Sequence, residues 1–172
     1  MLTQEQQKWI ENLSDVDQIK IIPFDITADK KFEKVREIIT SNLGESVPFI
    51  HGGATSLGIS GQDEIDTYIP VDVKLFDEYI EKLTKLFGVP RKVYEGNRVH
   101  FITYEGGKKI DVYLINKETK NWTDSVKFIN VLKTHPEKLE EYRLLKESGN
   151  GLSVRQYYRK KLEFINQVIS LK

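Results

Sequence analysis

The sequence predicts an α/β protein of the α+β kind, with a small mixed β-sheet flanked by helices and a carboxy-terminal helical segment. Segments whose apolar residues recur every three to four positions predict amphipathic helices, and short alternating or apolar segments predict strands. Both kinds occur over residues 1–118, whereas residues 119–172 have helical patterns only. Because 172 residues suffice for one hydrophobic core, we expect a single domain with an α/β core over 1–118 and terminal helices over 119–172.

Helices are expected on both sides of the first strands, where apolar residues recur at helical spacing. The segment Ala28–Leu43 stops at Gly44, a residue that can adopt a left-handed capping conformation. The segment Val73–Phe87 follows Asp72, whose side chain can cap a helix, and stops at Gly88. The expected helices are about Thr3–Leu13, Ala28–Leu43 and Val73–Phe87.

Strands are expected where short apolar or alternating segments lie between turn residues. The turn Glu105-Gly106-Gly107-Lys108 is suited to a hairpin between two of them. A further short apolar run, Ile19–Phe24, is broken at Pro23. The expected strands are about Val47–His51, Glu64–Val71, Val99–Tyr104 and Lys109–Ile115, with Arg91–Tyr94 as a candidate fifth.

The last part of the chain has no strand pattern. Its apolar residues keep helical spacing, and the turn segments Thr134-His135 and Gly149-Asn150-Gly151 interrupt them. We therefore expect three closing helices, at about Asp124–Lys133, Pro136–Glu147 and Val154–Ile169.

The composition excludes several classes of protein. Lys plus Arg and Asp plus Glu both number 26, so the formal net charge is zero and gives no general attraction to nucleic acid or anionic membranes. There is no cysteine, which excludes disulfides, thiolate-bound metals and cysteine nucleophiles. No apolar run approaches the roughly 20 residues that cross a bilayer, and the amino terminus is polar. We expect a cytoplasmic protein without membrane contact.

The segment Ile50–Val71 joins a glycine turn to a strand that carries acids. Gly52 and Gly53 end one expected strand, and Glu64 and Asp66 lie two residues apart on the next. Because side chains alternate along a strand, residues two apart share one face. The two carboxylates can therefore contact the same cation.

A third acid comes from a separate strand. Asp111 interrupts the apolar alternation of Lys109–Ile115 and shares a strand face with Tyr113. Carboxylate oxygens are the ligands that Mg²⁺ prefers in proteins. The trio Glu64, Asp66 and Asp111 is therefore the candidate metal site.

Structural explanations exist for each of these features. Gly52-Gly53 is also compatible with a tight turn that binds nothing, and acids near a strand end commonly face water. A Walker-type phosphate loop is absent, because no Gly-Lys-Ser or Gly-Lys-Thr follows the glycines. The chain also lacks a Gly-x-Ser-x-Gly elbow, which argues against a serine hydrolase.

Two further groups of residues have both a functional and a structural interpretation. His51 lies beside the glycine turn and is a candidate phosphate contact, whereas His100 and His135 are expected to be structural or surface residues. The last helix mixes basic residues with tyrosines, which is typical of a solvated face but also suits phosphate or single-stranded nucleic acid. These residues are Arg155, Tyr157, Tyr158, Arg159, Lys160 and Lys161.

The glycine turn followed by carboxylates resembles the polymerase-β-like nucleotidyltransferase superfamily. In that superfamily one strand delivers a Gly-Gly or Gly-Ser turn, and an adjacent strand delivers the carboxylates. The resemblance implies a nucleotidyltransferase-like fold with a nucleoside triphosphate at the turn, where glycines let the backbone approach the phosphates. The implied nucleotide contacts are His51, Gly52, Gly53, Thr55 and Ser56.

The same resemblance implies Mg²⁺ on the carboxylates Glu64, Asp66 and Asp111. Two such ions would bridge the phosphates and stabilise the attacking and leaving oxygens. One of the carboxylates could also assist deprotonation of the acceptor hydroxyl. The acceptor, a small molecule or a macromolecule, is not indicated by the sequence.

The sequence is also similar to the GrpB family, whose members show Gly-Ser-Thr-Ser-Val-Pro-Gly followed by Lys-Pro-Ile-Ile-Asp. Gly53-Ala54-Thr55-Ser56-Leu57 and Ile65-Asp66 match this pattern. The similarity extends over most of the chain. It includes Ile21–Asp25, Phe128-Ile129, Leu132, His135-Pro136-Glu137, Tyr142, Leu144-Leu145-Lys146, Tyr157, Lys161 and Phe164-Ile165.

Departures from these patterns separate the fold from the activity. Ala54 replaces the serine of the family, and Gln62-Asp63 stands in place of Lys-Pro. If Asp66 is the first superfamily carboxylate, the second position is Tyr68, which cannot ligate magnesium as a carboxylate does. Two hypotheses follow: a magnesium-dependent nucleotidyltransferase acting on a hydroxyl acceptor, or a non-catalytic nucleotide-binding or regulatory module. Nucleic-acid binding through the last helix is a third.

Overall fold

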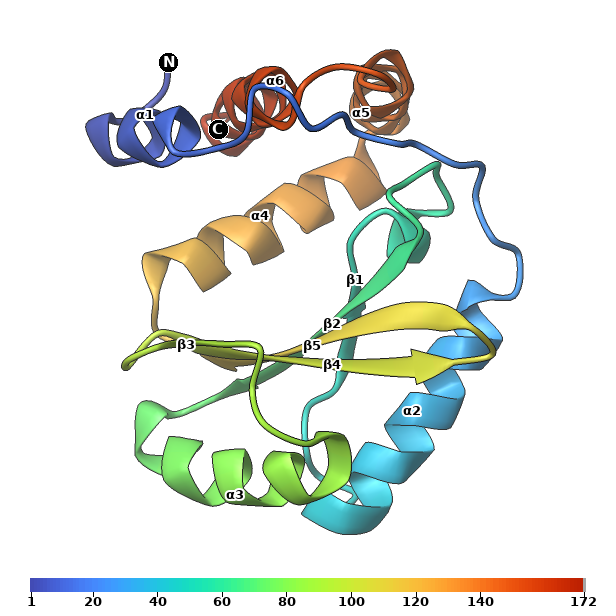
Figure 1. Ribbon diagram of the computed structural model, residues 1–172, viewed down its shortest axis with the longest axis vertical. Coiled ribbons are helices and arrows are strands. Elements are labelled where there is room, and N and C mark those ends of the chain that lie inside the picture. The colour runs from blue at the N-terminus through green and yellow to red at the C-terminus, as the bar shows by residue number, and fades with distance from the viewer. Residues whose placement is uncertain (172) are drawn as a thin grey trace. The chain divides into compact units, whose positions relative to one another are not determined.

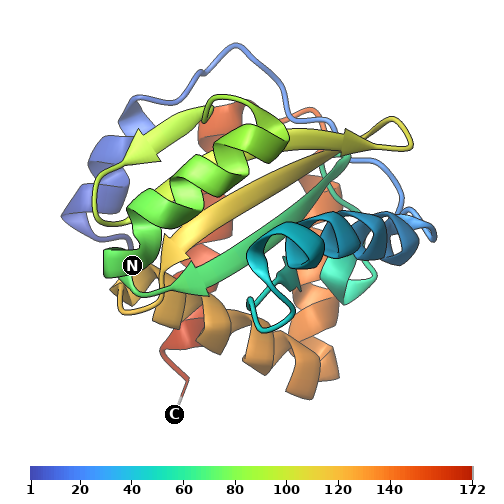
Figure 2. The ribbon, with the colours of Figure 1, turned by 90° about the horizontal axis from the view of Figure 1, so that it is seen from below.

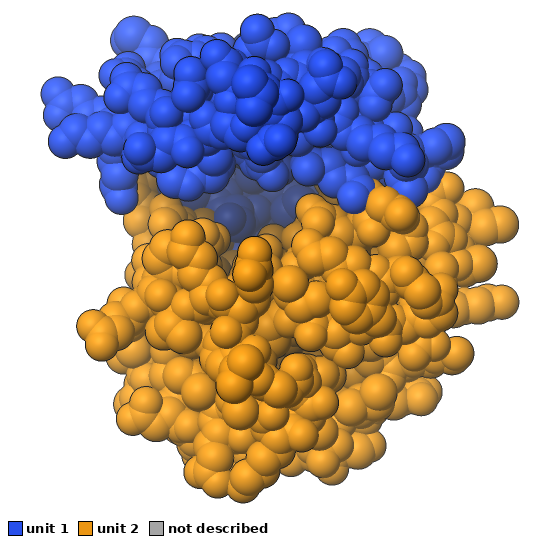
Figure 3. Space-filling model, in the orientation of Figure 1, with its two compact units in different colours: residues 1–23, 59–62, 124–172 blue, residues 24–58, 63–123 orange. Residues whose placement is uncertain are grey.

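The computed structural model describes residues 1–171, and Figure 1 shows the order of its elements. The predicted fold class is confirmed: within these residues a five-stranded mixed sheet combines with six α-helices. The described chain divides into two compact units, which Figure 3 colours separately. Unit 2 comprises Phe24–Gly58 and Asp63–Thr123, and unit 1 comprises Met1–Pro23, Ile59–Gln62 and the chain from Asp124 onward.

Unit 2 contains the whole sheet. Its strand order is β1-β2-β5-β4-β3, in which β2 and β5 are parallel and the other neighbours are antiparallel. The strands are β1 (Ile50–Gly52), β2 (Glu64–Val71), β3 (Lys92–Tyr94), β4 (Arg98–Glu105) and β5 (Lys108–Asn116).

Helices α2 (Ala28–Leu43) and α3 (Phe76–Phe87) lie on one face of this sheet, as Figures 1 and 2 show. Their apolar stripes pack against the inward-facing residues of the strands, and this is the hydrophobic core of unit 2. Because strand side chains alternate, the opposite face of the sheet carries the remaining side chains. Core residues that are fully buried include Ile39, Ile65, Ile69, Leu83, Phe101, Val112 and Leu114.

Turn and helix ends in unit 2 follow the sequence closely, with differences at Gly44, at Asp72 and at the start of α3. Gly106 and Gly107 both have positive φ, 54° and 76°, as expected for a two-residue hairpin between β4 and β5. α2 ends before Gly44 as expected, but that residue has φ 107° and ψ 148°, which is not the left-handed helical conformation. The α-helix expected from Val73 begins at Phe76, after the 3₁₀ helix η2 (Val73–Leu75). Asp72 makes no side-chain capping bond to η2, and its carboxylate pairs with Lys117 at 3.1 Å.

Unit 1 consists of helices and irregular chain. Its helices are α1 (Gln4–Glu11), most of α4 (Lys120–Thr134), α5 (Pro136–Ser148) and α6 (Val154–Ile169). Thr3 and Ser153 begin α1 and α6 with capping boxes, and these satisfy backbone N–H groups at the helix starts. The apolar run Ile19–Phe24 forms no strand and makes a single β-bridge, from Ile22 to Gly61. A membrane-spanning helix is not found among the residues that the structure describes.

Candidate functional site

The face of the sheet opposite α2 and α3 carries the acids that the sequence singled out. Along β2, Ile65 points into the core, and Glu64, Asp66 and Tyr68 lie partly exposed on the other face. The parallel register of β2 with β5 pairs Asp66 with Asp111. Two neighbouring strands thus deliver acids to the same place.

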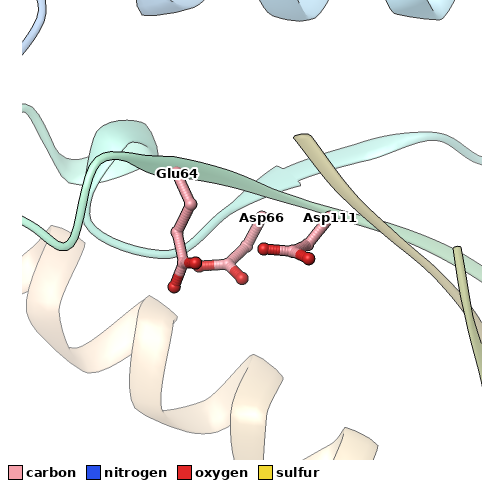
Figure 4. A group of neighbouring side chains, drawn as sticks. All are labelled: Glu64, Asp66 and Asp111. Carbon is pink, nitrogen blue, oxygen red and sulfur yellow. The ribbon is translucent and has the colours of Figure 1, made fainter. Parts of the chain in front are cut away.

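Glu64, Asp66 and Asp111 form a compact group, in which one carboxylate oxygen from each residue lies within 4.8 Å of the others. Figure 4 shows the three side chains projecting to the same side of their strands. Mg²⁺ and Ca²⁺ bind oxygens at roughly 2.0–2.6 Å, so oxygens on opposite sides of such an ion are roughly 4–5 Å apart. This donor set therefore fits a hard divalent cation.

Asp111 is the most buried of the three acids, and both of its carboxylate oxygens have partners. Its side chain is 2% exposed, with Nε2 of His100 2.6 Å from Oδ1 and Nζ of Lys109 2.8 Å from Oδ2. A buried charge is costly unless it is paired. These two contacts compensate the burial of Asp111 and fix the orientation of its carboxylate.

Lys109 connects Asp111 to a second acid of the group. Its Nζ also lies 3.0 Å from Oε2 of Glu64. Partial burial acts to lower the pKa of Lys109, but the hydrogen bonds to Asp111 and Glu64 outweigh that effect and raise the pKa above its ordinary value. The ammonium group therefore remains charged at neutral pH and offsets part of the negative charge of the trio.

The glycine turn packs directly against the acidic strand. A Cβ on Gly53 would lie 2.9 Å from Cγ of Asp66, and a Cβ on Gly52 would lie 2.9 Å from Cδ2 of Tyr68. Real Cβ atoms essentially never approach other atoms within 3.0 Å. Gly53 also has a φ of 64°, a backbone conformation that residues with a Cβ rarely adopt. Both positions therefore need glycine for packing alone.

His51 does not lie beside the carboxylates. It pairs with Thr67 in the β1–β2 register, so its ring points to the helix-covered face and stacks on Phe32 with centroids 4.7 Å apart. Its Nε2 is 2.9 Å from Oγ1 of Thr55, and its Nδ1 is 3.3 Å from Oδ1 of Asp29. The structure thus connects His51 to the turn through Thr55, on the side away from the acids.

The hydroxyl groups of Thr55 and Ser56 both have protein partners, His51 for the first and the turn itself for the second. Thr55 and Ser56 begin a short 3₁₀ helix, η1 (Thr55–Leu57), and Oγ of Ser56 donates to the carbonyl oxygen of Gly53 at 3.0 Å. Thr55 is 9% exposed. The turn next to Asp66 is therefore held by the Ser56 hydroxyl and by the contact of Thr55 with His51.

A row of rings lies beside the acids on the same face of the sheet. Tyr68 stacks on Tyr113 at 5.5 Å, Tyr113 stacks on His100 at 4.5 Å, and Trp122 contacts Tyr68 at 5.4 Å between centroids. Burial, together with the negative charges of Asp66 and other acids of the trio, raises the pKa of Tyr113. Its phenol therefore stays neutral at physiological pH.

The basic residues of α6 belong to unit 1 and have separate contacts. Arg155 donates to the carbonyl oxygen of Leu13 at 2.9 Å and pairs with Asp15 at 3.2 Å, which fixes the chain that follows α1. Nζ of Lys161 lies 5.2 Å from the ring centroid of Tyr158. Arg155 therefore has a structural role in this segment.

Comparison with known proteins gives a consistent result. The family model described as GrpB protein matches residues 18–170. The crystal structure of conserved protein GrpB from Enterococcus faecalis has the same fold, with a TM-score of 0.62 at 17% sequence identity. That similarity covers 87% of this chain and 94% of the E. faecalis chain. None of the curated proteins matches the sequence.

Proposed function

The chain belongs to the GrpB family, and on that basis we propose that it is a nucleotidyltransferase-like protein that binds a nucleoside triphosphate with Mg²⁺. The observation that carries the proposal is the compact carboxylate trio, Glu64, Asp66 and Asp111, beside the glycine turn. The proposed nucleotide contacts are Gly52, Gly53, Thr55 and Ser56, with His51 supporting the turn through Thr55.

The proposed reaction transfers a nucleotidyl group to a hydroxyl-bearing acceptor. Bound Mg²⁺ would neutralise the charge that develops on the phosphate oxygens. Glu64 or Asp66 accepts the proton of the acceptor hydroxyl, while His100 keeps Asp111 oriented. The acceptor oxygen then forms a bond to the α-phosphorus, the bond from that phosphorus to the β-phosphate oxygen breaks, and pyrophosphate leaves.

A second candidate function is a non-catalytic nucleotide-binding or regulatory module on the same fold. Tyr68 favours it, because its ring stands on β2 where a further carboxylate would be expected and stacks on Tyr113. Such a module would bind the nucleotide without transferring any part of it. The acceptor would then have no role.

The first experiment measures binding of a nonhydrolysable nucleoside triphosphate by calorimetry, with and without Mg²⁺. Asp66→Asn removes one charge from the trio and should weaken magnesium-dependent binding by about tenfold or more. Asp72→Asn is the matched control, because Asp72 follows the same strand but pairs with Lys117. Absence of binding in the wild type and both variants would reject nucleotide binding.

The second experiment separates the two candidate functions. Wild-type protein is incubated with α-labelled nucleoside triphosphates, Mg²⁺ and a set of hydroxyl-bearing acceptors, and label transfer and pyrophosphate release are measured. Transfer that is lost in Asp66→Asn and retained in Asp72→Asn supports the enzyme. Binding without transfer to any acceptor supports the non-catalytic module.

A further inference from the structure

Lys109 occupies a position between two of the three carboxylates. Its Nζ lies 2.8 Å from Oδ2 of Asp111 and 3.0 Å from Oε2 of Glu64, so one ammonium group contacts oxygens from both strands. These residues also belong to the group whose oxygens lie within 4.8 Å of one another. A cation of this chain therefore already neutralises part of the donor set.

The partners of Asp111 determine how a metal can reach it. Oδ1 is 2.6 Å from Nε2 of His100, and Oδ2 is the oxygen that Lys109 contacts. The His100 ring is fixed by stacking on Tyr113, whereas Lys109 has a flexible four-carbon side chain that is 35% exposed. Of the two partners, Lys109 is the one that can withdraw.

The charges of the site also indicate that a bound metal would displace Lys109. Three carboxylates carry three negative charges, and Lys109 offsets one of them. A divalent cation within the trio would repel an ammonium group held on the same oxygens, since like charges a few ångströms apart interact strongly in a partly buried site. Metal and lysine therefore compete for Glu64 and Asp111.

We propose that Lys109 is an exchangeable internal cation: a divalent metal takes Glu64 and Asp111 from it, and the released ammonium binds a phosphate of the incoming nucleotide. The inference rests on the proposed function, because it uses the same metal and nucleotide site. A lysine ammonium is a compact point charge on a long stem and is well suited to phosphate oxygens. Lys109 thus couples metal loading to nucleotide binding.

The exchange predicts that one substitution at Lys109 raises the affinity for metal and lowers the affinity for nucleotide. Lys109→Met should bind Mn²⁺ about tenfold more tightly than wild type, since the competing charge is gone. The same variant should bind the Mn²⁺ complex of a nonhydrolysable nucleoside triphosphate about tenfold less tightly, since the phosphate loses a cationic partner. A lysine that only stabilises the fold would not shift the two affinities in opposite directions.

The experiment measures Mn²⁺ binding by electron paramagnetic resonance and metal–nucleotide binding by calorimetry. Lys117→Met is the matched control, because Lys117 follows β5 and pairs with Asp72 away from the trio; both of its affinities should equal those of wild type. Lys109→Gln repeats the test with a polar side chain in case Lys109→Met folds poorly. In addition, ¹³C-dimethylated wild-type protein should show a shift of the Lys109 signal when Mg²⁺ is added.

The outcomes distinguish this inference from the proposed function. If wild type binds Mn²⁺ and both Lys109 variants bind it equally well or more weakly, the exchange is wrong and the metal site stands. If metal binds more tightly but nucleotide affinity is unchanged or higher, the transfer of Lys109 to phosphate is wrong. If wild type and the Lys109 variants bind neither Mn²⁺ nor the metal–nucleotide complex, the proposed function itself is rejected. If they bind only the metal–nucleotide complex, the exchange is wrong and the proposed function stands.

Discussion

Gly53→Ala tests the contact between the glycine turn and the acidic strand. The new Cβ would lie 2.9 Å from Cγ of Asp66 and 3.1 Å from its Cβ, with Oδ2 closer than either. The variant can fold only if the Asp66 side chain moves or the turn opens. Either change moves a carboxylate of the trio, so we expect both stability and metal binding to fall.

Gly58→Ala provides the matched comparison for the size of this effect. Gly58 has φ 68°, almost the same as the 64° of Gly53, but a Cβ there would meet nothing within 4 Å. The positive φ alone should lower the free energy of unfolding by about 1–2 kcal/mol in both variants. The clash with Asp66 should add about 1–3 kcal/mol in Gly53→Ala, as overpacking does elsewhere.

The assay is urea denaturation, combined in a double-mutant cycle with Asp66→Ala. Removing the carboxylate takes away Oδ2 and Cγ, so the cost of Gly53→Ala should be smaller in the Asp66→Ala background by about 1–3 kcal/mol. Equal costs of Gly53→Ala in the two backgrounds would refute the clash. So would equal costs of Gly53→Ala and Gly58→Ala in the wild-type background.

Two further predictions concern stability alone. Hydrogen bonds from Lys31 and Thr27 hold the pKa of Asp25 well below its usual 3.8. Ionised Asp25 therefore stabilises the fold above about pH 4, and this contribution is lost as the pH falls through the lowered pKa. Asp25→Asn should lower the free energy of unfolding at pH 7, and this free energy should then fall less in the variant than in wild type as the pH is lowered. Curves of unfolding free energy against pH that run parallel in the two proteins would contradict this. Ser153→Ala removes the capping box with Gln156 and should cost about 1–2 kcal/mol in urea denaturation, whereas Ser153→Thr should cost much less.

The sequence best predicts the elements whose buried face follows from the spacing of their own apolar residues. α2 begins at Ala28 and ends at Leu43, as the spacing of its apolar residues and the following glycine predicted. Ile19–Phe24 is apolar as well, but a strand also needs a neighbour to pair with, and only Ile22 forms a bridge in this run. The parallel pairing of β2 with β5 likewise depends on a distant partner, which periodicity does not identify.

Alternation along one strand predicts that Glu64 and Asp66 share a face, whereas Asp111 joins them only through the pairing of β2 with β5. Lys109 was missed, although it lies two residues before Asp111 and must share its strand face. His100 was expected to be a structural or surface residue, but the hairpin turn between β4 and β5 already indicates which sheet face its side chain shares. A two-residue turn that pairs Glu105 with Lys108 also pairs His100 with Tyr113, which places the histidine on the acidic face.

The glycine turn and the acids are not independent features, because a Cβ on Gly53 would meet the side chain of Asp66. Gly53 allows Asp66 to keep its position, and a phosphate contact at the same glycine would use the same absence of a side chain. A loss of nucleotide binding in Gly53→Ala is therefore expected from either cause. Metal affinity separates them: a displaced Asp66 weakens Mn²⁺ binding without nucleotide, whereas a lost phosphate contact leaves it intact.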